Sequence, residues 1–198
     1  MAHFEVLMAG TGGQGLVFCS SFLAEAAIKT GKNVVQTQSY GISQRGGFIS
    51  AEVIIDDGEI MFQQVTKPDV IIAFSDVVGT RYDEAACPVV YDTTLMQTRN
   101  FPNWIGIPMM QIAGELGADK SANLAGLAGA MSLCGAISLE GLLALAEATV
   151  AIEQKDVPKR AKSISHAIAI IHDGLHASLD MESGGELATR LAALYDYM

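Results

Sequence analysis

The segment EVLMAGTGGQG, residues 5–15, determines the fold expected for this chain. Its first six residues are a short apolar run that ends on a glycine, which is typical of a buried parallel strand. Gly10, Gly12 and Gly15 follow with the spacing G-x-G-x-x-G. Between a strand and a helix, this spacing is frequent in loops that bind dinucleotides. The loop is therefore the first candidate site in the chain.

The residues after this loop predict an α/β fold. Apolar residues recur at helical spacing from Gln14 to Thr30, and Gly31 supplies a stop signal for the helix. Residues 32–39 then predict a second strand. A strand, a helix and a strand in this order form a βαβ unit, which implies a parallel sheet.

Further along the chain, two β-rich runs flank Asp57-Gly58, a strong turn signal, and predict a β-hairpin. Short apolar strands are expected over 67–75, 87–92 and 103–109. Beyond residue 110 only alanine-rich helical stretches follow, at 121–136, 139–151, 158–173 and 185–196. The sequence therefore predicts one α/β domain over residues 1–198. It has a Rossmann-like, mainly parallel sheet with flanking helices, a β-hairpin and a helical C-terminal part.

Composition limits the classes of binding partner and indicates the cellular compartment of the chain. With 12 basic and 22 acidic side chains the net charge is −10, which argues against nucleic acid and anionic membrane surfaces as partners. Cys19, Cys87 and Cys134 are far apart and include no C-x-x-C pair, so no metal or cluster site is expected. A sparse, odd number of cysteines and an N-terminus without a basic leader favour the cytoplasm. Residues 121–139 contain no charged side chain. They are mainly alanine, glycine and serine, which favours a closely packed buried helix over a membrane span.

The glycine loop leaves several interpretations open. Dinucleotide sites usually place an acidic residue after the second strand, where this chain has Gln36, Gln38 and Ser39. No Lys-Ser/Thr pair follows the last glycine, so the loop is not a P-loop. The glycines would then bind a nucleotide, let helix and strand pack closely, or bind another anion or a partner's backbone.

A second glycine-rich segment, SYGISQRGG at residues 39–47, follows the second strand. In a parallel sheet it would lie at the same edge as the first loop, and together the two loops would form a recognition surface. The candidate site therefore consists of residues from both loops: Gly10, Gly12, Gly13, Gln14, Gly15, Ser39, Tyr40, Gly41, Arg45, Gly46 and Gly47.

Five segments, in this order and spacing, resemble the gamma subunit of 2-oxoacid:ferredoxin oxidoreductases. They are G-x-G-G-Q-G at 10–15, S-Y-G-x-x-x-R-G-G at 39–47, PDVIIAFS at 68–75, VVYD at 89–92 and ANLAGLAGAMS at 122–132. QTQSYG is similar to the 2-oxoglutarate branch, and SQRGG is also similar to indolepyruvate relatives. The last thirty residues contain no segment that resembles this family.

The resemblance implies a subunit of an enzyme complex. Such a complex decarboxylates a 2-oxoacid on thiamine diphosphate, passes electrons through iron-sulfur clusters to ferredoxin and transfers the acyl group to coenzyme A. Thiamine diphosphate, Mg and the clusters are expected in partner subunits of alpha, beta and delta type, and none of these cofactors in this chain. Ferredoxin would be an indirect partner.

In such a complex this chain would contribute assembly and the region through which coenzyme A gains access. Its two loops would face coenzyme A or a partner subunit. The isolated chain would be inactive and would self-associate through a docking patch. The substrate would be 2-oxoglutarate, or alternatively indolepyruvate, pyruvate or a branched-chain 2-oxoacid. A self-sufficient Rossmann-like dehydrogenase is a further alternative, which the missing acidic residue after the second strand disfavours.

Overall fold

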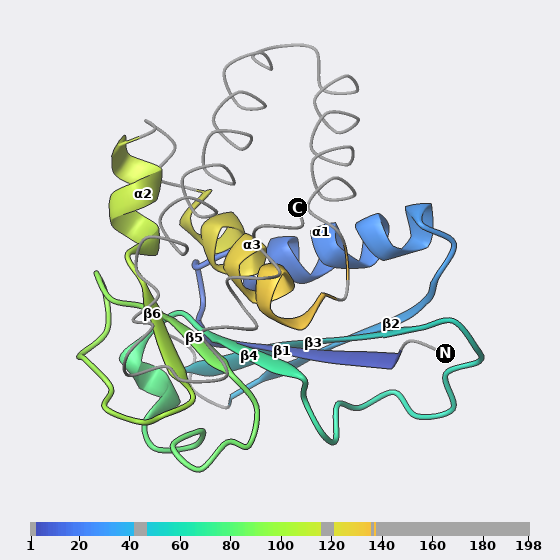
Figure 1. The fold of residues 1–198 in the computed structure, drawn as a ribbon, viewed down its shortest axis with the longest axis horizontal. Coiled ribbons are helices and arrows are strands. Elements are labelled where there is room, and N and C mark those ends of the chain that lie inside the picture. The colour runs from blue at the N-terminus through green and yellow to red at the C-terminus, as the bar shows by residue number, and fades with distance from the viewer. Residues whose placement is uncertain (1–2, 42–46, 116–120, 136, 138–198) are drawn as a thin grey trace.

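The computed structural model describes residues 3–41, 47–115, 121–135 and 137 (Figure 1). In this part of the chain six strands form one sheet in the order β2-β3-β1-β4-β5-β6. The strands are β1 (His3–Thr11), β2 (Asn33–Tyr40), β3 (Phe48–Asp56), β4 (Val70–Ala73), β5 (Val89–Asp92) and β6 (Trp104–Ile107). The helices are α1 (Leu16–Lys29), α2 (Met109–Glu115) and α3 (Ala122–Cys134), with a short 3-10 turn η1 (Asp76–Val78).

One half of the sheet is parallel, as predicted. β1 pairs with β4, β4 with β5 and β5 with β6, all in parallel. Every residue of β4 and β5 is buried, which matches the continuous apolar runs of strands covered on both faces. Figure 1 shows α1 and α3 on the same face of the sheet. The mixed α/β architecture with a mainly parallel sheet is therefore confirmed.

The other half corrects the predicted βαβ unit. β3 lies between β1 and β2 and is antiparallel to both, so β1 and β2 run in the same direction without pairing. The burial patterns explain this order. In the middle of β3, side chains on both faces of the sheet are buried, whereas every residue of β2 is half-buried or exposed. A strand with the polar run Gln36–Ser39 suits the edge of a sheet better than its interior.

The hairpin predicted at Asp57-Gly58 is wrong. No strand follows this turn, and the chain continues without regular structure to β4. Both sides of β3 are already paired, with β1 and with β2, so no free side is left for residues 59–64. The hairpin in the structure joins β2 to β3 through residues 41–47. The Asp56 side chain accepts a hydrogen bond of 2.7 Å from the Gly58 N–H. This turn therefore ends strand β3 and does not lead into another strand.

Helix α1 begins two residues later than predicted and ends at Lys29, one residue before the predicted end. Gly15 precedes it with φ +73°, a left-handed conformation that suits glycine. At the other end Gly31 has φ +80°, and its N–H donates to the Ile28 carbonyl at 2.9 Å. The Lys32 N–H donates to the Ala27 carbonyl at 3.1 Å, which completes the Schellman arrangement of a glycine stop.

The core has two parts, one on each face of the sheet. On the helix side Met8 and Val53 pack with α1 and α3 through buried residues such as Leu23 and Met131. On the opposite face Ile71, Val89, Tyr91 and Trp104 belong to a second cluster. Helix α3 confirms the stretch predicted at 121–136. The helices predicted at 139–151, 158–173 and 185–196 lie outside the described residues.

Candidate functional site

The two glycine segments begin at the same edge of the sheet. Gly10 in β1 and Tyr40 in β2 both pair with Ile49 of β3, one on each side. The insertion of β3 therefore holds the carboxyl ends of β1 and β2 one strand apart. Gly41 and Gly47 lie within the described residues, whereas Arg45 and Gly46 lie outside them.

The glycine loop is closed by its own side chain. The Gln14 Oε1 accepts a hydrogen bond of 2.7 Å from the Thr11 N–H, and its Nε2 donates to the Phe74 carbonyl at 2.7 Å. The carboxamide therefore joins the loop after β1 to the residue after β4. In dinucleotide-binding folds the backbone at this point approaches a pyrophosphate. In this chain the Thr11 N–H donates to the Gln14 side chain instead and is not free to bind a phosphate.

Gly10 and Gly15 provide room for neighbouring side chains. A Cβ on Gly10 would overlap Gln14 Oε1, and it would lie 3.2 Å from the Phe74 Cβ. A Cβ on Gly15 would overlap Asn123 Nδ2, which donates to the Gly15 carbonyl at 3.1 Å. Asn123 is a buried residue of α3. At these two positions the structure favours close packing among the three interpretations left open by the sequence.

Four other described residues of the candidate site, Gly12, Gly13, Tyr40 and Gly41, form an exposed rim. Gly12 and Gly13 are exposed, and Gly13 has φ +90°. Tyr40 is 62% exposed and donates from its hydroxyl to Gln38 at 2.6 Å. The Gly41 N–H donates to the Phe48 carbonyl at 2.8 Å, and a Cβ on Gly41 would come within 2.9 Å of that oxygen. This rim is the part of the site that is open to a ligand or partner.

Two contacts hold the neighbouring strand ends in place, and the sequence did not predict either of them. The guanidinium of Arg81 lies 4.6 Å from the centre of the Phe48 ring, a cation–π contact beside the second glycine segment. The buried Asp92 accepts hydrogen bonds from the N–H groups of Thr94 at 2.8 Å and Met110 at 3.3 Å. Asp92 thereby connects the end of β5 to the start of α2. The VVYD motif ends on this residue, which was the available signal.

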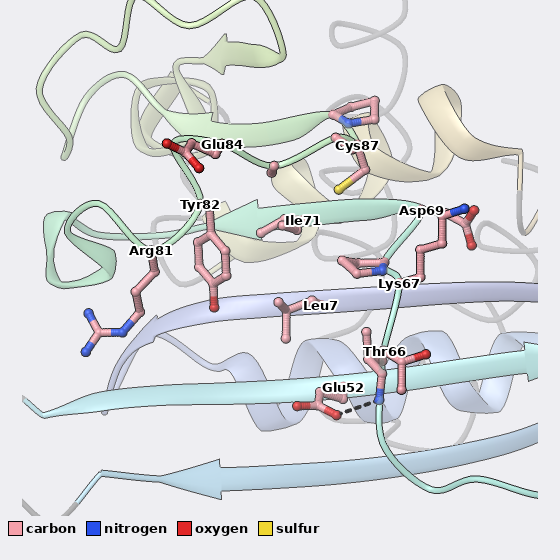
Figure 2. Close-up of a pocket in the computed structure, with 15 residues that line it drawn as sticks. Leu7, Glu52, Thr66, Lys67, Asp69, Ile71, Arg81, Tyr82, Glu84 and Cys87 are labelled. Carbon is pink, nitrogen blue, oxygen red and sulfur yellow. Dashed lines mark hydrogen bonds between the residues drawn. The ribbon is translucent and has the colours of Figure 1, made fainter.

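A cavity of about 580 Å³ lies on the face of the sheet opposite α1 and α3 (Figure 2). Leu7 and Ile71 are on its floor, and Tyr82 and Cys87 line it from the segment between β4 and β5. Burial raises the pKa of Tyr82 and that of Cys87. Because a thiol with a raised pKa stays protonated, Cys87 is a poor nucleophile.

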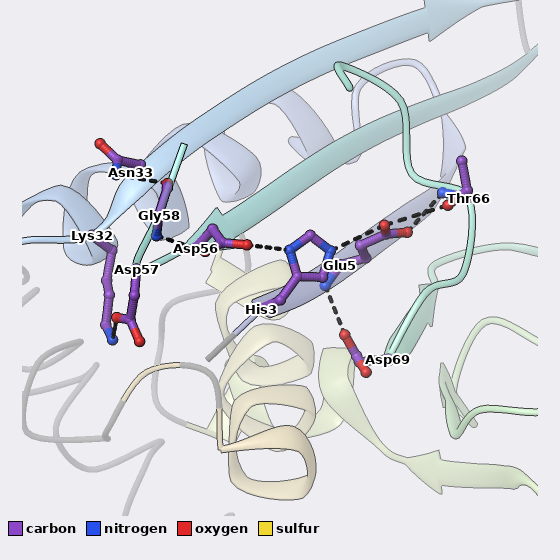
Figure 3. Close-up of polar contacts among 9 residues, drawn as sticks. All are labelled: His3, Glu5, Lys32, Asn33, Asp56, Asp57, Gly58, Thr66 and Asp69. Carbon is purple, nitrogen blue, oxygen red and sulfur yellow. Dashed lines mark hydrogen bonds and ion pairs between the residues drawn. The ribbon is translucent and has the colours of Figure 1, made fainter. Parts of the chain in front are cut away.

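A polar cluster lies at the opposite end of β1 from the glycine loop (Figure 3). His3 Nδ1 lies 2.5 Å from Asp56 Oδ2, and its Nε2 lies 3.2 Å from Glu5 Oε1. Glu5 also accepts hydrogen bonds of 2.7 Å from the N–H groups of Thr66 and Lys67, which attach this segment to β1.

The pKa values of this cluster follow from its contacts. Hydrogen bonds to Asp56 and then to Glu5 raise the pKa of His3. Burial raises the pKa of Glu5, but hydrogen bonds from Lys67, His3 and Thr66 outweigh it, so the pKa lies below its ordinary value. The Gly58 N–H and then His3 lower the pKa of Asp56. These shifts favour the protonated form of the His3 imidazole, which lies between the two carboxylates.

The described residues bear on metal binding and on membrane spanning. No group of three or more His, Cys, Asp or Glu side chains in this part of the chain is arranged to hold a metal ion. None of the helices described here has the length and apolar character needed to cross a membrane.

Comparison with known proteins identifies the family. Residues 5–177 match the family of pyruvate ferredoxin/flavodoxin oxidoreductases. The chain belongs to this family. The 2-oxoglutarate synthase subunit KorC of Archaeoglobus fulgidus is 34% identical over 135 residues, which cover 66% of this chain and 71% of KorC. KorC of Methanocaldococcus jannaschii is 35% identical over 119 residues, or 56% of this chain and 64% of that protein.

Solved structures have the same fold. The gamma subunit of a keto/oxoacid ferredoxin oxidoreductase from Geobacter sulfurreducens PCA superimposes with a TM-score of 0.70 at 25% identity. The superposition covers 90% of this chain and 99% of that subunit. The predicted resemblance of this chain to gamma subunits of 2-oxoacid:ferredoxin oxidoreductases is thus confirmed.

A shorter stretch is similar to a protein of another kind. The flagellar secretion chaperone FliS of Salmonella typhimurium is 53% identical over 55 residues, which cover 28% of this chain and 41% of FliS. The chain is therefore similar, over different lengths, to two kinds of protein. The single domain over residues 1–198 stays a prediction.

The His3 cluster predicts how stability depends on pH. The folded chain raises the pKa of His3 above its unfolded value, so this stabilisation is present below about pH 6.5 and is lost as pH rises through the folded value. From about pH 6 to pH 9, urea unfolding should therefore show a larger fall in stability for the wild-type chain than for His3→Gln. Equal falls for the two proteins would contradict the charged pairing.

Proposed function

We propose that this chain is the gamma subunit of an oxidoreductase complex that oxidatively decarboxylates 2-oxoglutarate and transfers the acyl group to coenzyme A. Its family membership and the 34% identity to a 2-oxoglutarate synthase subunit support this assignment. In this proposal thiamine diphosphate, Mg and iron-sulfur clusters reside in partner subunits of alpha, beta and delta type. Ferredoxin takes electrons from those clusters rather than from this chain, and the complex works in the cytoplasm.

The observation that carries the proposal is the Gln14 bridge. Its carboxamide bonds the Thr11 N–H and the Phe74 carbonyl, so the loop is braced by its own side chain. Asn123 occupies the space beside Gly15. These contacts favour a rigid docking element over a nicotinamide cradle, which needs the backbone of the loop for phosphate. A self-sufficient dehydrogenase is therefore the weaker alternative.

The exposed rim would face the path of coenzyme A or a partner subunit. It consists of Gly12, Gly13, Tyr40 and Gly41, and the second segment continues to Arg45. Coenzyme A carries phosphate charges, and a guanidinium can bind a phosphate through two hydrogen bonds. We assign the recognition of those phosphates to the 39–47 segment, with Arg45 as its cation.

The assignment is tested by comparing the purified complex with the isolated chain. The complex should reduce a viologen dye when both 2-oxoglutarate and coenzyme A are present, and should do so more slowly with pyruvate, indolepyruvate or a branched-chain 2-oxoacid. The isolated chain should be inactive with every substrate. NAD-dependent oxidation by the isolated chain would contradict the proposal, and preference for another 2-oxoacid would contradict the substrate.

The role of Arg45 is tested by steady-state kinetics on the assembled complex. Loss of one charge-assisted contact costs about 1.5–3 kcal/mol, or roughly ten- to hundredfold in affinity. Arg45→Ala should therefore raise the KM for coenzyme A by about that factor and leave the KM for the 2-oxoacid nearly unchanged. Arg45→Lys, the matched control, keeps the charge and should have a smaller effect. Full assembly with an unchanged coenzyme A KM would contradict the role.

A further inference from the structure

Strand β2 presents an open edge. It is the outermost strand of the sheet, and no other strand of the described residues pairs with its outer side. The Gly41 N–H donates to Phe48 of β3, and antiparallel strands alternate between inward and outward backbone groups. The N–H and C=O groups of Val34, Gln36, Gln38 and Tyr40 therefore point away from β3. They form a row of donors and acceptors available to another strand.

This edge lacks the features that usually prevent strand pairing. Edge strands are normally protected by charged side chains, proline, bulges or short length. β2 is eight residues long and contains neither a charged residue nor proline. Its register with β3 runs unbroken from Asn33 to Tyr40. The opposite edge, β6, has four residues and is followed by Pro108.

Helix α1 places exposed apolar side chains beside this edge. Phe18 is 53% exposed and Ile28 is 60% exposed. They lie on one stripe of the helix with Ser21 and Glu25, at spacings of three, four and three residues. The Ser21 hydroxyl accepts a hydrogen bond of 3.1 Å from Gln36 Nε2, which places this stripe along β2.

We propose that two copies of this chain associate through their β2 edges. The strands pair antiparallel about a twofold axis, which joins the two sheets into one and sets the two α1 helices side by side. In that arrangement Phe18 of each copy faces Ile28 of the other, and Ser21 faces Glu25. The dimer does not depend on the proposed catalytic role.

Self-pairing fits this edge better than the other strand partners the chain offers. Because β2 is uncharged, no antiparallel register places like charges opposite each other. Pairing of β2 with β6 of another copy would match eight residues with four and would form an open-ended chain of copies. Pairing of β2 with β2 closes as a dimer. Each copy has a net charge of −10, so added salt should strengthen the association by screening repulsion.

Sedimentation velocity of the full chain tests the dimer. The wild-type chain should show a concentration-dependent monomer–dimer equilibrium that moves toward dimer when salt is raised. Gln38→Lys adds a charge to the exposed edge and Gln38→Pro removes an outward N–H while leaving the bonds to β3. Each should weaken association by about tenfold or more. Gln111→Lys, the matched control at an exposed position of α2, should leave the association unchanged.

Circular dichroism and thermal melting show whether each variant is folded, and Gln38→Lys suffices if Gln38→Pro does not fold. A wild-type chain that stays monomeric at about 100 μM in high salt would overturn the proposal. So would a dimer that both Gln38 variants leave intact, because its interface would lie elsewhere. A dimer that weakens with added salt would contradict an association that charge repulsion between the copies opposes.

Discussion

The hydrogen bonds of one carboxamide hold the candidate site together. Gln14 accepts from the Thr11 N–H and donates to the Phe74 carbonyl, both at 2.7 Å. Thr11 is the last residue of β1 and Phe74 follows the neighbouring parallel strand β4, so the side chain fixes how the loop after β1 lies against the end of β4. Gly10 leaves room for this carboxamide, and Gly15 leaves room for Asn123. Two of the three glycines in the spacing that suggested a nucleotide site are therefore accounted for by two amide side chains, and Gly12 lies in the exposed rim.

The position of β3 determines which segments lie beside the loop after β1. Because β3 separates β1 from β2, Gly10 and Tyr40 lie on either side of Ile49. The same insertion places β2 at the edge of the sheet, with α1 and its exposed Phe18 alongside. One topological feature thus produces both the rim proposed to face coenzyme A or a partner subunit and the edge proposed to pair with a second copy.

Local features of the fold could be predicted from the sequence, and distant pairings could not. The buried runs of β4 and β5 and the stop at Gly31 depend on neighbouring residues, and the structure confirms them. The Asp57-Gly58 turn gave a wrong hairpin, because a turn signal does not reveal that β3 is already paired on both sides. The sequence places Gln14 in the candidate site, but its partner Phe74 is 60 residues away along the chain. Asn123 and Gly15 are 108 residues apart, a contact that only the folded chain reveals.

Hydrogen exchange of the loop amides tests the central claim most directly. The Thr11 N–H is bonded to Gln14, whereas Gly12 and Gly13 lie exposed in the same loop and serve as internal references. If the Gln14 carboxamide closes the loop in solution, the Thr11 amide should exchange at least tenfold more slowly than those of Gly12 and Gly13, after correction for sequence-dependent exchange rates. Equal protection factors for the three amides would show an open loop and contradict the account.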